Sequence, residues 1–308
     1  MKVFIKKIAI LASILIVLIL TATQLPMDQD NYLKAYNKKC ELLENTHSPR
    51  IIFVGGSNLA FGLDSQRIKD SLNINVINYG LHAGIGLKYM IDDISEYARK
   101  GDVIVFAPEY DHFYTTAYGE EAISSLMVAS HWKKAYLLGI RQWINVLSGI
   151  PQLIRESTLT PKNKTPKDYR ASGFNEYGDE IQHWTLESRG SGAIKPIKET
   201  FNKQFGNYFI EKVKTLQKVC SVFVIPPIYV EKAYNKNKKK VHEVEEFLRE
   251  KECPFLVTPE THVLSDENAY DTYYHMNRQG VDKYTSYIIE ELRPLLKTNK
   301  NPIAPNEK

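Results

Sequence analysis

Residues 50–58 read Arg-Ile-Ile-Phe-Val-Gly-Gly-Ser-Asn, an apolar run that breaks into two glycines and a serine. A short apolar run bounded by glycines is typical of a buried strand, and we expect that strand over residues 51–54. The glycines predict a tight turn that leaves the Ser57 hydroxyl exposed at the strand's carboxyl end. A serine hydroxyl becomes a good nucleophile when a histidine takes its proton and an acid orients that histidine. The stretch therefore predicts a first strand and a candidate nucleophile.

Downstream of this strand, short apolar runs alternate with amphipathic segments of helical period. Such alternation is typical of an α/β fold in which helices cover both faces of a mostly parallel sheet. Functional residues in these sheets gather at the carboxyl ends of the strands. We expect strands over 51–54, 74–78, 103–107, 222–225 and 255–257, and helices over 64–72, 86–100, 200–218, 240–251 and 278–296.

The composition of the 308-residue chain changes along its length and indicates four segments. We expect an N-terminal signal anchor or transmembrane helix at 1–25, a polar stalk at 26–49 that ends in a short helix, the main domain at 50–297 and a polar tail at 298–308. The alternation stops at about 110–200, where tyrosine, tryptophan and histidine are frequent. We interpret that stretch as an insertion lying over the strand edge.

Three lysines among the first seven residues precede an apolar stretch over residues 8–20. This pattern is typical of a signal peptide or of a short membrane anchor. A spanning helix needs roughly 17–25 apolar residues, so this one would have to extend into residues 21–25. Because no Ala-x-Ala cleavage site follows, we favour an uncleaved anchor. The preceding lysines place the N-terminus inside the cell and the main domain outside the cytoplasm.

The formal net charge of +4 is too small to indicate a nucleic-acid-binding protein. The basic run at 235–240 is interpreted as the solvated start of a helix. Cys40, Cys220 and Cys253 lack the spacing of a metal site. We expect buried thiols, with a single disulfide still open, and we expect no metal and no cofactor.

A second group of chemically useful residues lies at 271–280, which read Asp-Thr-Tyr-Tyr-His-Met-Asn-Arg-Gln-Gly. His275 enters the last expected helix and can reach back to the strand edge. Asp271 can contact the other ring nitrogen of His275 if the loop between them curls. Alone, the pair is more often a surface histidine with a capping acid. Together with Ser57 it predicts a Ser-His-Asp triad.

The blocks at 55–58 (Gly-Gly-Ser-Asn), 78–84 (Asn-Tyr-Gly-Leu-His-Ala-Gly) and Asp271/His275 resemble those of the SGNH (GDSL-like) hydrolase superfamily over about residues 50–297. The resemblance implies a flavodoxin-like three-layer α/β/α sandwich. It implies that Ser57 is the nucleophile, His275 the general base and then acid, and Asp271 the residue that orients His275. It also implies an oxyanion hole made by the backbone N–H groups of Ser57 and a glycine, either Gly84, which we favour, or Gly80.

The chain departs from the family's pattern at two points. Where the family has an asparagine that completes the oxyanion hole, residues 107–112 read Ala-Pro-Glu-Tyr-Asp-His. Glu109 is a poor replacement unless it is protonated, so His82 or Asn58 could complete the hole, and all three are possible substrate contacts. The Asp-x-x-x-His spacing is one residue longer than the family's, which leaves Asp266 as an alternative acid.

Within this superfamily, the membrane-anchored layout of the chain resembles the exported branch that is linked to acylation of cell-surface polymers. That branch includes the alginate O-acetylation proteins and the D-alanyl-lipoteichoic-acid protein. We expect an O-acyltransferase or esterase that acts on a cell-surface glycan through an acyl-enzyme on Ser57. It would be a single-pass protein of the bacterial inner (cytoplasmic) membrane with its catalytic domain outside. The family implies a membrane-bound acyl-carrying partner. The alternative, favoured by the missing asparagine, is a non-catalytic glycan-binding or assembly subunit.

Overall fold

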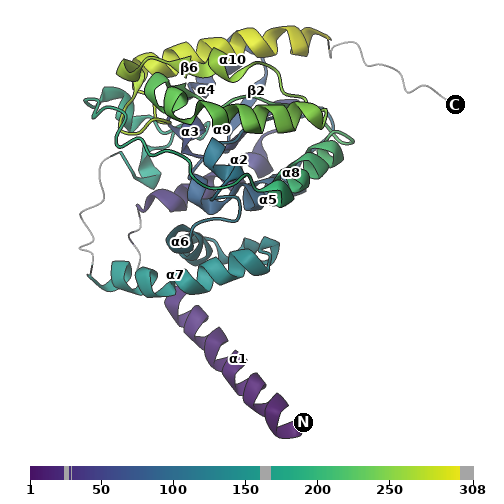
Figure 1. Ribbon diagram of the computed structural model, residues 1–308, viewed down its shortest axis with the longest axis vertical. Coiled ribbons are helices and arrows are strands. Elements are labelled where there is room, and N and C mark those ends of the chain that lie inside the picture. The colour runs from purple at the N-terminus through teal and green to yellow at the C-terminus, as the bar shows by residue number, and fades with distance from the viewer. Residues whose placement is uncertain (24–27, 29, 160–167, 299–308) are drawn as a thin grey trace, which may run out of the picture.

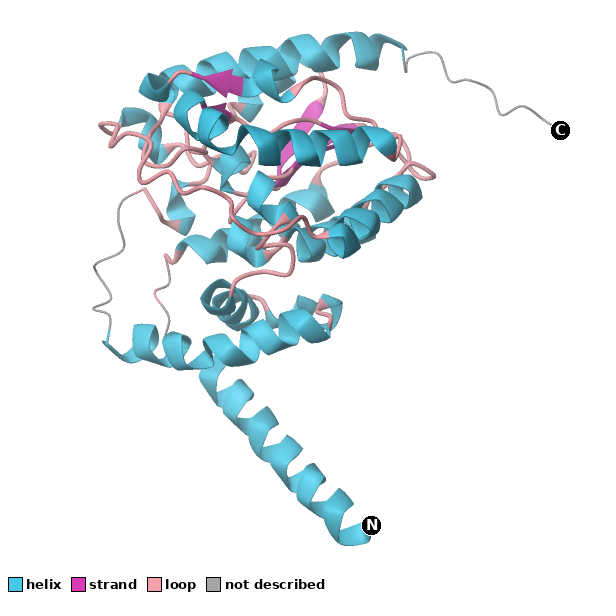
Figure 2. Cartoon of the chain, viewed as in Figure 1, coloured by secondary structure: helices cyan, strands magenta, loops and turns pink. Residues whose placement is uncertain are grey.

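The computed structural model describes residues 1–23, 28, 30–159 and 168–298. Its body is an α/β fold built on a parallel sheet with the strand order β2-β1-β3-β4, and helices surround this sheet (Figures 1 and 2). The expected α/β class and the parallel sheet are therefore confirmed. The strands are β1 (Arg50–Gly55), β2 (Asn75–Asn78), β3 (Val103–Ala107) and β4 (Ser221–Val224).

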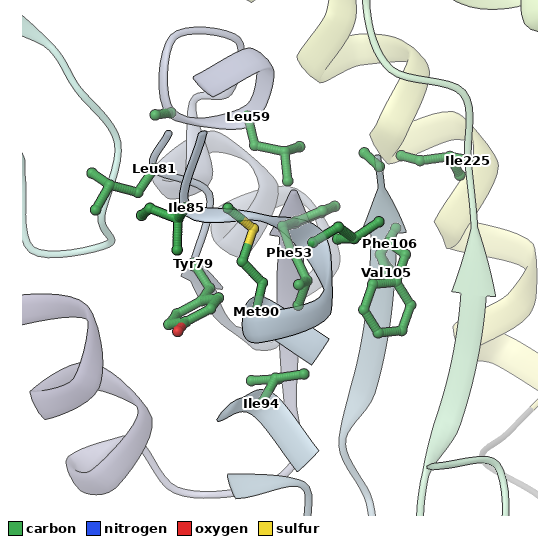
Figure 3. Packing of buried hydrophobic residues seen from close by; sticks show 14 of the residues in the cluster. Phe53, Leu59, Tyr79, Leu81, Ile85, Met90, Ile94, Val105, Phe106 and Ile225 are labelled. Atoms are coloured by element: carbon green, nitrogen blue, oxygen red, sulfur yellow. The ribbon is translucent and has the colours of Figure 1, made fainter. Parts of the chain in front are cut away.

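The apolar run of β1 lies at the centre of the molecule. Ile52 is aligned with Ile77 of β2 on one side and with Ile104 of β3 on the other. A strand that is paired on both sides and covered on both faces has no polar face, which is why its sequence shows no alternation. Figure 3 shows Phe53 among the side chains of this core. The three cysteines are buried free thiols, as expected.

Two groups of helices cover the sheet. Helix α4 (Ser65–Leu72) packs against α10 (Arg278–Thr298), whereas α5 (Leu87–Tyr97) packs against α8 (Lys203–Leu216). Right-handed crossovers from β1 to β2 and from β2 to β3 place α4 on the face opposite α5. Figure 1 shows α10 along one side of the body and α8 with α5 along the other. The carboxyl ends of the strands are therefore left to form a site.

The C-terminal part differs from expectation in two details. Residues 255–257 form no strand, because Phe255 makes only a single parallel bridge to Val224 before Pro259 begins a short 3-10 helix. Helix α9 (Glu231–Glu250) begins earlier than expected, since the basic run at 235–240 lies inside it and lysine is a good helix former. A small separate sheet pairs β5 (Tyr229–Val230) with β6 (Val263–Leu264).

The expected stalk is wrong, because the described residues after position 29 pack into the body. Helix α2 (Ala35–Asn45) buries Leu43 completely and contacts β2. The amino group of the buried Lys39 donates to the carbonyl oxygens of Asn78 (2.8 Å) and Gly178 (2.6 Å). Apolar positions at helical spacing within this polar segment explain why it docks on the domain. Residues 299–308, most of the expected tail, lie outside the described residues.

Helix α1 (Lys2–Thr23) occupies the segment for which the sequence predicted an anchor. Figure 1 shows it leaving the body next to α7 as a single arm. None of the helices in the described part of the chain combines the length and the apolar character that a membrane-spanning segment requires. The expected transmembrane helix is thus not found there.

Between β3 and α8, a short 3-10 helix at Tyr110–Phe113 is followed by a helical hairpin of α6 (Glu121–Ser130) and α7 (Ile140–Leu159). The two helices pack closely, because a Cβ at Gly149 would lie 2.1 Å from the Glu121 carbonyl oxygen. The Ser125 hydroxyl also donates to the Val146 carbonyl oxygen across the hairpin (2.6 Å). From residue 168 the chain returns to the strand edge and brings Tyr169 there.

Candidate active site

Ser57 lies at the carboxyl end of β1, as the first residue of the short helix α3 (Ser57–Ala60). Gly56 precedes it, and a Cβ at Gly56 would lie 2.3 Å from Oε1 of Glu109. Glycine at this position therefore lets the turn after β1 approach the turn after β3, where Glu109 lies. Since β1 and β3 are neighbours in the sheet, the residues that follow them meet at the same edge.

The structure brings together the three residues of the expected triad. Oγ of Ser57 lies 2.8 Å from Nε2 of His275, and Nδ1 of His275 lies 2.7 Å from Oδ1 of Asp271. In the tautomer protonated at Nδ1, the ring donates to Asp271 and accepts the serine proton, which is the arrangement of a serine triad. Asp266, the alternative acid, lies 4.0 Å from Lys232 instead.

Ser57 and His275 open into a pocket of about 620 Å³. This volume falls within the roughly 300–1,000 Å³ usual for small-molecule sites. The remaining pocket wall combines aromatic, acidic and hydroxyl side chains with one lysine. It includes Tyr32, His82, Glu109, Asp111, Thr115, Thr116, Glu120, Tyr169, Lys195, Thr272, Tyr273 and Tyr274.

Asp271 is held by two residues that the sequence analysis did not single out. The Tyr169 hydroxyl donates to Oδ2 of Asp271 (2.7 Å), and Nη2 of Arg189 lies 2.9 Å from the same oxygen. Burial alone would raise the pKa of Asp271, but the hydrogen bond and charge of His275, followed by Tyr169 and Arg189, lower it to about 2. Asp271 therefore stays ionised and can stabilise an imidazolium at His275.

The His275 ring is also held by Phe61, another residue that the sequence analysis missed. The two rings stack with their centroids 4.2 Å apart and an interplanar angle of 10°. Phe61 is completely buried just after α3. Its stacking fixes the imidazole plane in which Nε2 faces Ser57. An isolated Phe in an apolar context carries no sequence signal for this role.

The structure does not turn the expected glycines of the oxyanion hole toward Ser57. The Gly84 N–H donates to Nδ1 of His82 (2.9 Å), and the Gly80 N–H donates to Oδ1 of Asn78 (3.0 Å). Asn58 is completely buried, and its amide donates to the Ala107 carbonyl oxygen (3.0 Å), so it ties α3 to β3 outside the pocket wall.

His82 and Glu109, the other expected contacts, do line the pocket with Ser57. Because Nδ1 of His82 accepts the Gly84 N–H, the ring's proton is on Nε2, which can donate. Burial, followed by the charge of His275, lowers the pKa of His82 to about 4, so the ring is neutral near pH 7. Glu109 contacts Ser57 directly, with 3.3 Å between Oε1 and Oγ.

Within the described residues, no group of three His, Cys, Asp or Glu side chains is arranged to hold a metal ion. The arrangement that is present supplies a nucleophile, a base and an orienting acid beside an open pocket. This set of groups is suited to acyl transfer through a covalent intermediate. Comparison with known proteins returns no match: no family model, no curated protein and no solved structure matches this chain.

Proposed function

We propose that this protein is a serine-dependent acyl-transfer enzyme. The observation that carries the proposal is the continuous hydrogen-bonded chain from Ser57 through His275 to Asp271, with distances of 2.8 and 2.7 Å. These residues are distant in sequence, and the chain ends at an open pocket. A histidine that merely satisfied a surface acid would not also face an accessible serine hydroxyl.

The geometry supports the following reaction. Nε2 of His275 takes the proton of Ser57 as Oγ bonds to the acyl carbon, and the carbonyl π electrons move to its oxygen. When this intermediate collapses, the bond to the leaving oxygen breaks and His275 returns the proton to that oxygen. A sugar hydroxyl or water then attacks the acyl-serine by the same route, which gives transferase or esterase activity respectively.

We propose that the chain has the flavodoxin-like fold of SGNH hydrolases. Its strand order 2-1-3-4 is the beginning of the flavodoxin-like order, whose ligands bind where β1 and β3 adjoin. The Phe255 bridge lies beside β4, where a fifth strand would continue the sheet. The triad is in the expected chain order, with the serine after the first strand and the acid and histidine before the last helix.

For the acceptor we propose a cell-surface glycan. The pocket wall contains aromatic rings, such as Tyr273, that can stack on a sugar, and the carboxyl groups of Asp111 and Glu120, which can accept hydrogen bonds from sugar hydroxyls. A membrane-bound carrier would supply the acyl group. We place the body outside the bacterial cytoplasmic membrane, with exposed apolar side chains of α1 at the lipid.

One observation favours a second candidate, a non-catalytic glycan-binding subunit. The Asn58 N–H donates to Oε1 of Glu109 (3.1 Å), so an acidic group occupies a backbone donor beside the serine. In a binding protein this contact would simply close the turn. The two candidates differ in whether Ser57 reacts.

The purified full-length chain incubated with p-nitrophenyl acetate tests the proposal. We expect burst release of nitrophenol and labelling of Ser57 by a fluorophosphonate. Ser57→Ala should abolish both, and His275→Ala should lower turnover by at least about 10³-fold. Ser148→Ala, which changes an exposed serine on α7, is the matched control. A folded chain with neither turnover nor labelling at Ser57 would exclude the enzyme and favour the binding subunit.

A further inference from the structure

Glu109 is the acidic residue closest to the reacting atoms and has no role in the triad. It follows β3 at the sheet edge, its side chain reaches the pocket, and the residue is only 5% exposed. No lysine or arginine forms an ion pair with it among the described residues. A buried carboxyl beside a serine nucleophile needs an explanation, because an ionised one would repel the oxyanion that forms there.

The hydrogen bonds of Glu109 fix the orientation of its carboxyl group. Oε1 accepts the Asn58 N–H at 3.1 Å and lies 3.3 Å from Oγ of Ser57. Because Oε1 is the acceptor, the proton of the neutral acid is on Oε2. Gly56 leaves just enough space for this carboxyl, as a Cβ there would lie 2.3 Å from Oε1. The carboxyl is thus anchored through one oxygen and can donate through the other.

We propose that Glu109, as a neutral carboxylic acid, is the side-chain donor of the oxyanion hole. This inference rests on the proposed acyl-transfer function. As the Ser57 Oγ–carbon bond forms and the carbonyl electrons move to oxygen, the Glu109 O–H donates to that oxygen. Glu109 keeps its proton throughout, since His275 carries the transferred proton to the leaving group.

The surroundings of Glu109 favour the neutral form near pH 7. Burial raises the pKa of Glu109 to about 8 and the charge of Asp111 raises it further, although the backbone N–H groups of Asn58 and Ser57 and the Ser57 hydroxyl oppose the shift. The titratable groups that line the pocket with Glu109 are Tyr32, His82, Asp111, Glu120, Tyr169, Lys195, Tyr273, Tyr274 and His275.

The proposal predicts a loss of activity at alkaline pH. Above about pH 8 Glu109 ionises, so it stops donating and its negative charge opposes the oxyanion. The rate constant for acylation should then fall by about tenfold per pH unit. Glutamine has nearly the same shape, donates through its amide and does not titrate, so it separates the donor role from the charge.

The test measures acylation of the full-length chain by p-nitrophenyl acetate from pH 6 to pH 10, with the Ser57→Ala rate subtracted as background. We expect Glu109→Gln to keep the pH 7 rate within about tenfold and to lose the alkaline fall, whereas Glu109→Ala should lose about 10²–10³-fold at every pH. Glu246→Gln, which changes an exposed carboxyl on α9 outside the pocket wall, should keep both the rate and the alkaline fall.

Two results would overturn the proposal. The first is a Glu109→Ala variant as active as the parent or more active, which would make Glu109 an obstacle to the substrate. The second is a Glu109→Gln variant that is as slow as Glu109→Ala, or that keeps the parent's alkaline fall, with thermal unfolding unchanged. Failure of the acyl-transfer function itself would look different, because Ser57 would then be neither labelled nor needed for turnover.

Discussion

At the scale of single residues, Tyr169 links the insertion to the proposed catalytic triad. Its hydroxyl donates to Oδ2 of Asp271 (2.7 Å) and lies 3.2 Å from Nδ1 of His275. Arg189 holds the same oxygen of Asp271 from the solvent side. Because Oδ2 is taken by these two residues, Oδ1 remains for the imidazole. Tyr169 is therefore a positioning residue whose loss should loosen the triad without removing any of its members.

We expect Tyr169→Phe to lower kcat/KM by about tenfold, since a hydrogen bond to a charged group contributes about 1.5–3 kcal/mol and Arg189 retains part of the constraint. Turnover of p-nitrophenyl acetate measures the effect. Because the Tyr169 hydrogen bond lowers the pKa of Asp271, its loss should raise that pKa and move the acidic limb of the pH profile to higher pH. Tyr287→Phe is the control, because Tyr287 lies on α10 and its ring stacks on His262, away from the site. Equal activities of the two variants at every pH would contradict this role.

Single residues of the site could be predicted only where a reactive side chain lies within a recognisable local sequence pattern. Ser57 and the Asp271/His275 pair could be predicted because a glycine turn and a short acid-histidine spacing are local signals. Tyr169 carries no such signal, since its role depends on where the chain packs after residue 168, far in sequence from Asp271. The direction of the Gly84 N–H depends on a side chain, His82, that competes for it. No residue pattern reveals that competition.

At the scale of elements, the buried Arg50–Asp102 ion pair ties the start of β1 to the turn before β3. Nη2 of Arg50 lies 3.3 Å from Oδ2 of Asp102 and donates to the Tyr97 carbonyl oxygen (2.9 Å), and neither side chain of the pair is exposed. The pair sits at the opposite end of β1 from Ser57. It therefore stabilises the fold without contacting Ser57 or His275.

Arg50→Ala should destabilise the protein by about 3–5 kcal/mol, because it leaves the Asp102 carboxylate buried without its cation. Arg67→Ala is the matched control. Its pair with Asp282 spans 3.8 Å between side chains that are 42% and 44% exposed, and such pairs contribute about 0–1 kcal/mol. Denaturant unfolding of both variants measures the difference. Similar unfolding midpoints would show that the buried pair is not important for stability.

Strands and helices could be predicted from the sequence where a segment's apolar pattern matches the way it is buried in the structure. The four strands of the main sheet overlap the expected ones because each contains buried apolar residues within a short segment, including β2, which reads Asn-Val-Ile-Asn. The expected strand at 255–257 is also apolar, but it is short and Pro259 follows closely, so it pairs through one bridge only. The short helix expected at the end of the stalk is present as α2, but its docking on the domain was missed, because the segment is polar on average and its few apolar residues share one face.

At the scale of the whole molecule, α1 exposes many apolar side chains to solvent. Contiguous apolar surface of this extent is unusual on a protein and marks an interaction with a lipid or protein surface. The lysines at its start favour anionic lipid headgroups. The exposed apolar side chains of α1 include Val3, Phe4, Ile5, Ile8, Ile10, Leu11, Ile14 and Val17.

We expect the full-length chain to sediment with vesicles of phosphatidylcholine and phosphatidylglycerol, and the double variant Leu11→Asp, Ile14→Asp to remain in the supernatant. Each carboxylate would have to leave water on binding, which costs a few kcal/mol per residue at a lipid-buried helix position. Val219→Asp, which changes an exposed apolar residue of the body, should still sediment. All three chains should hydrolyse p-nitrophenyl acetate equally, since Ser57 and His275 lie in the body. Sedimentation of the double variant like its parent would show that α1 does not attach the protein to lipid.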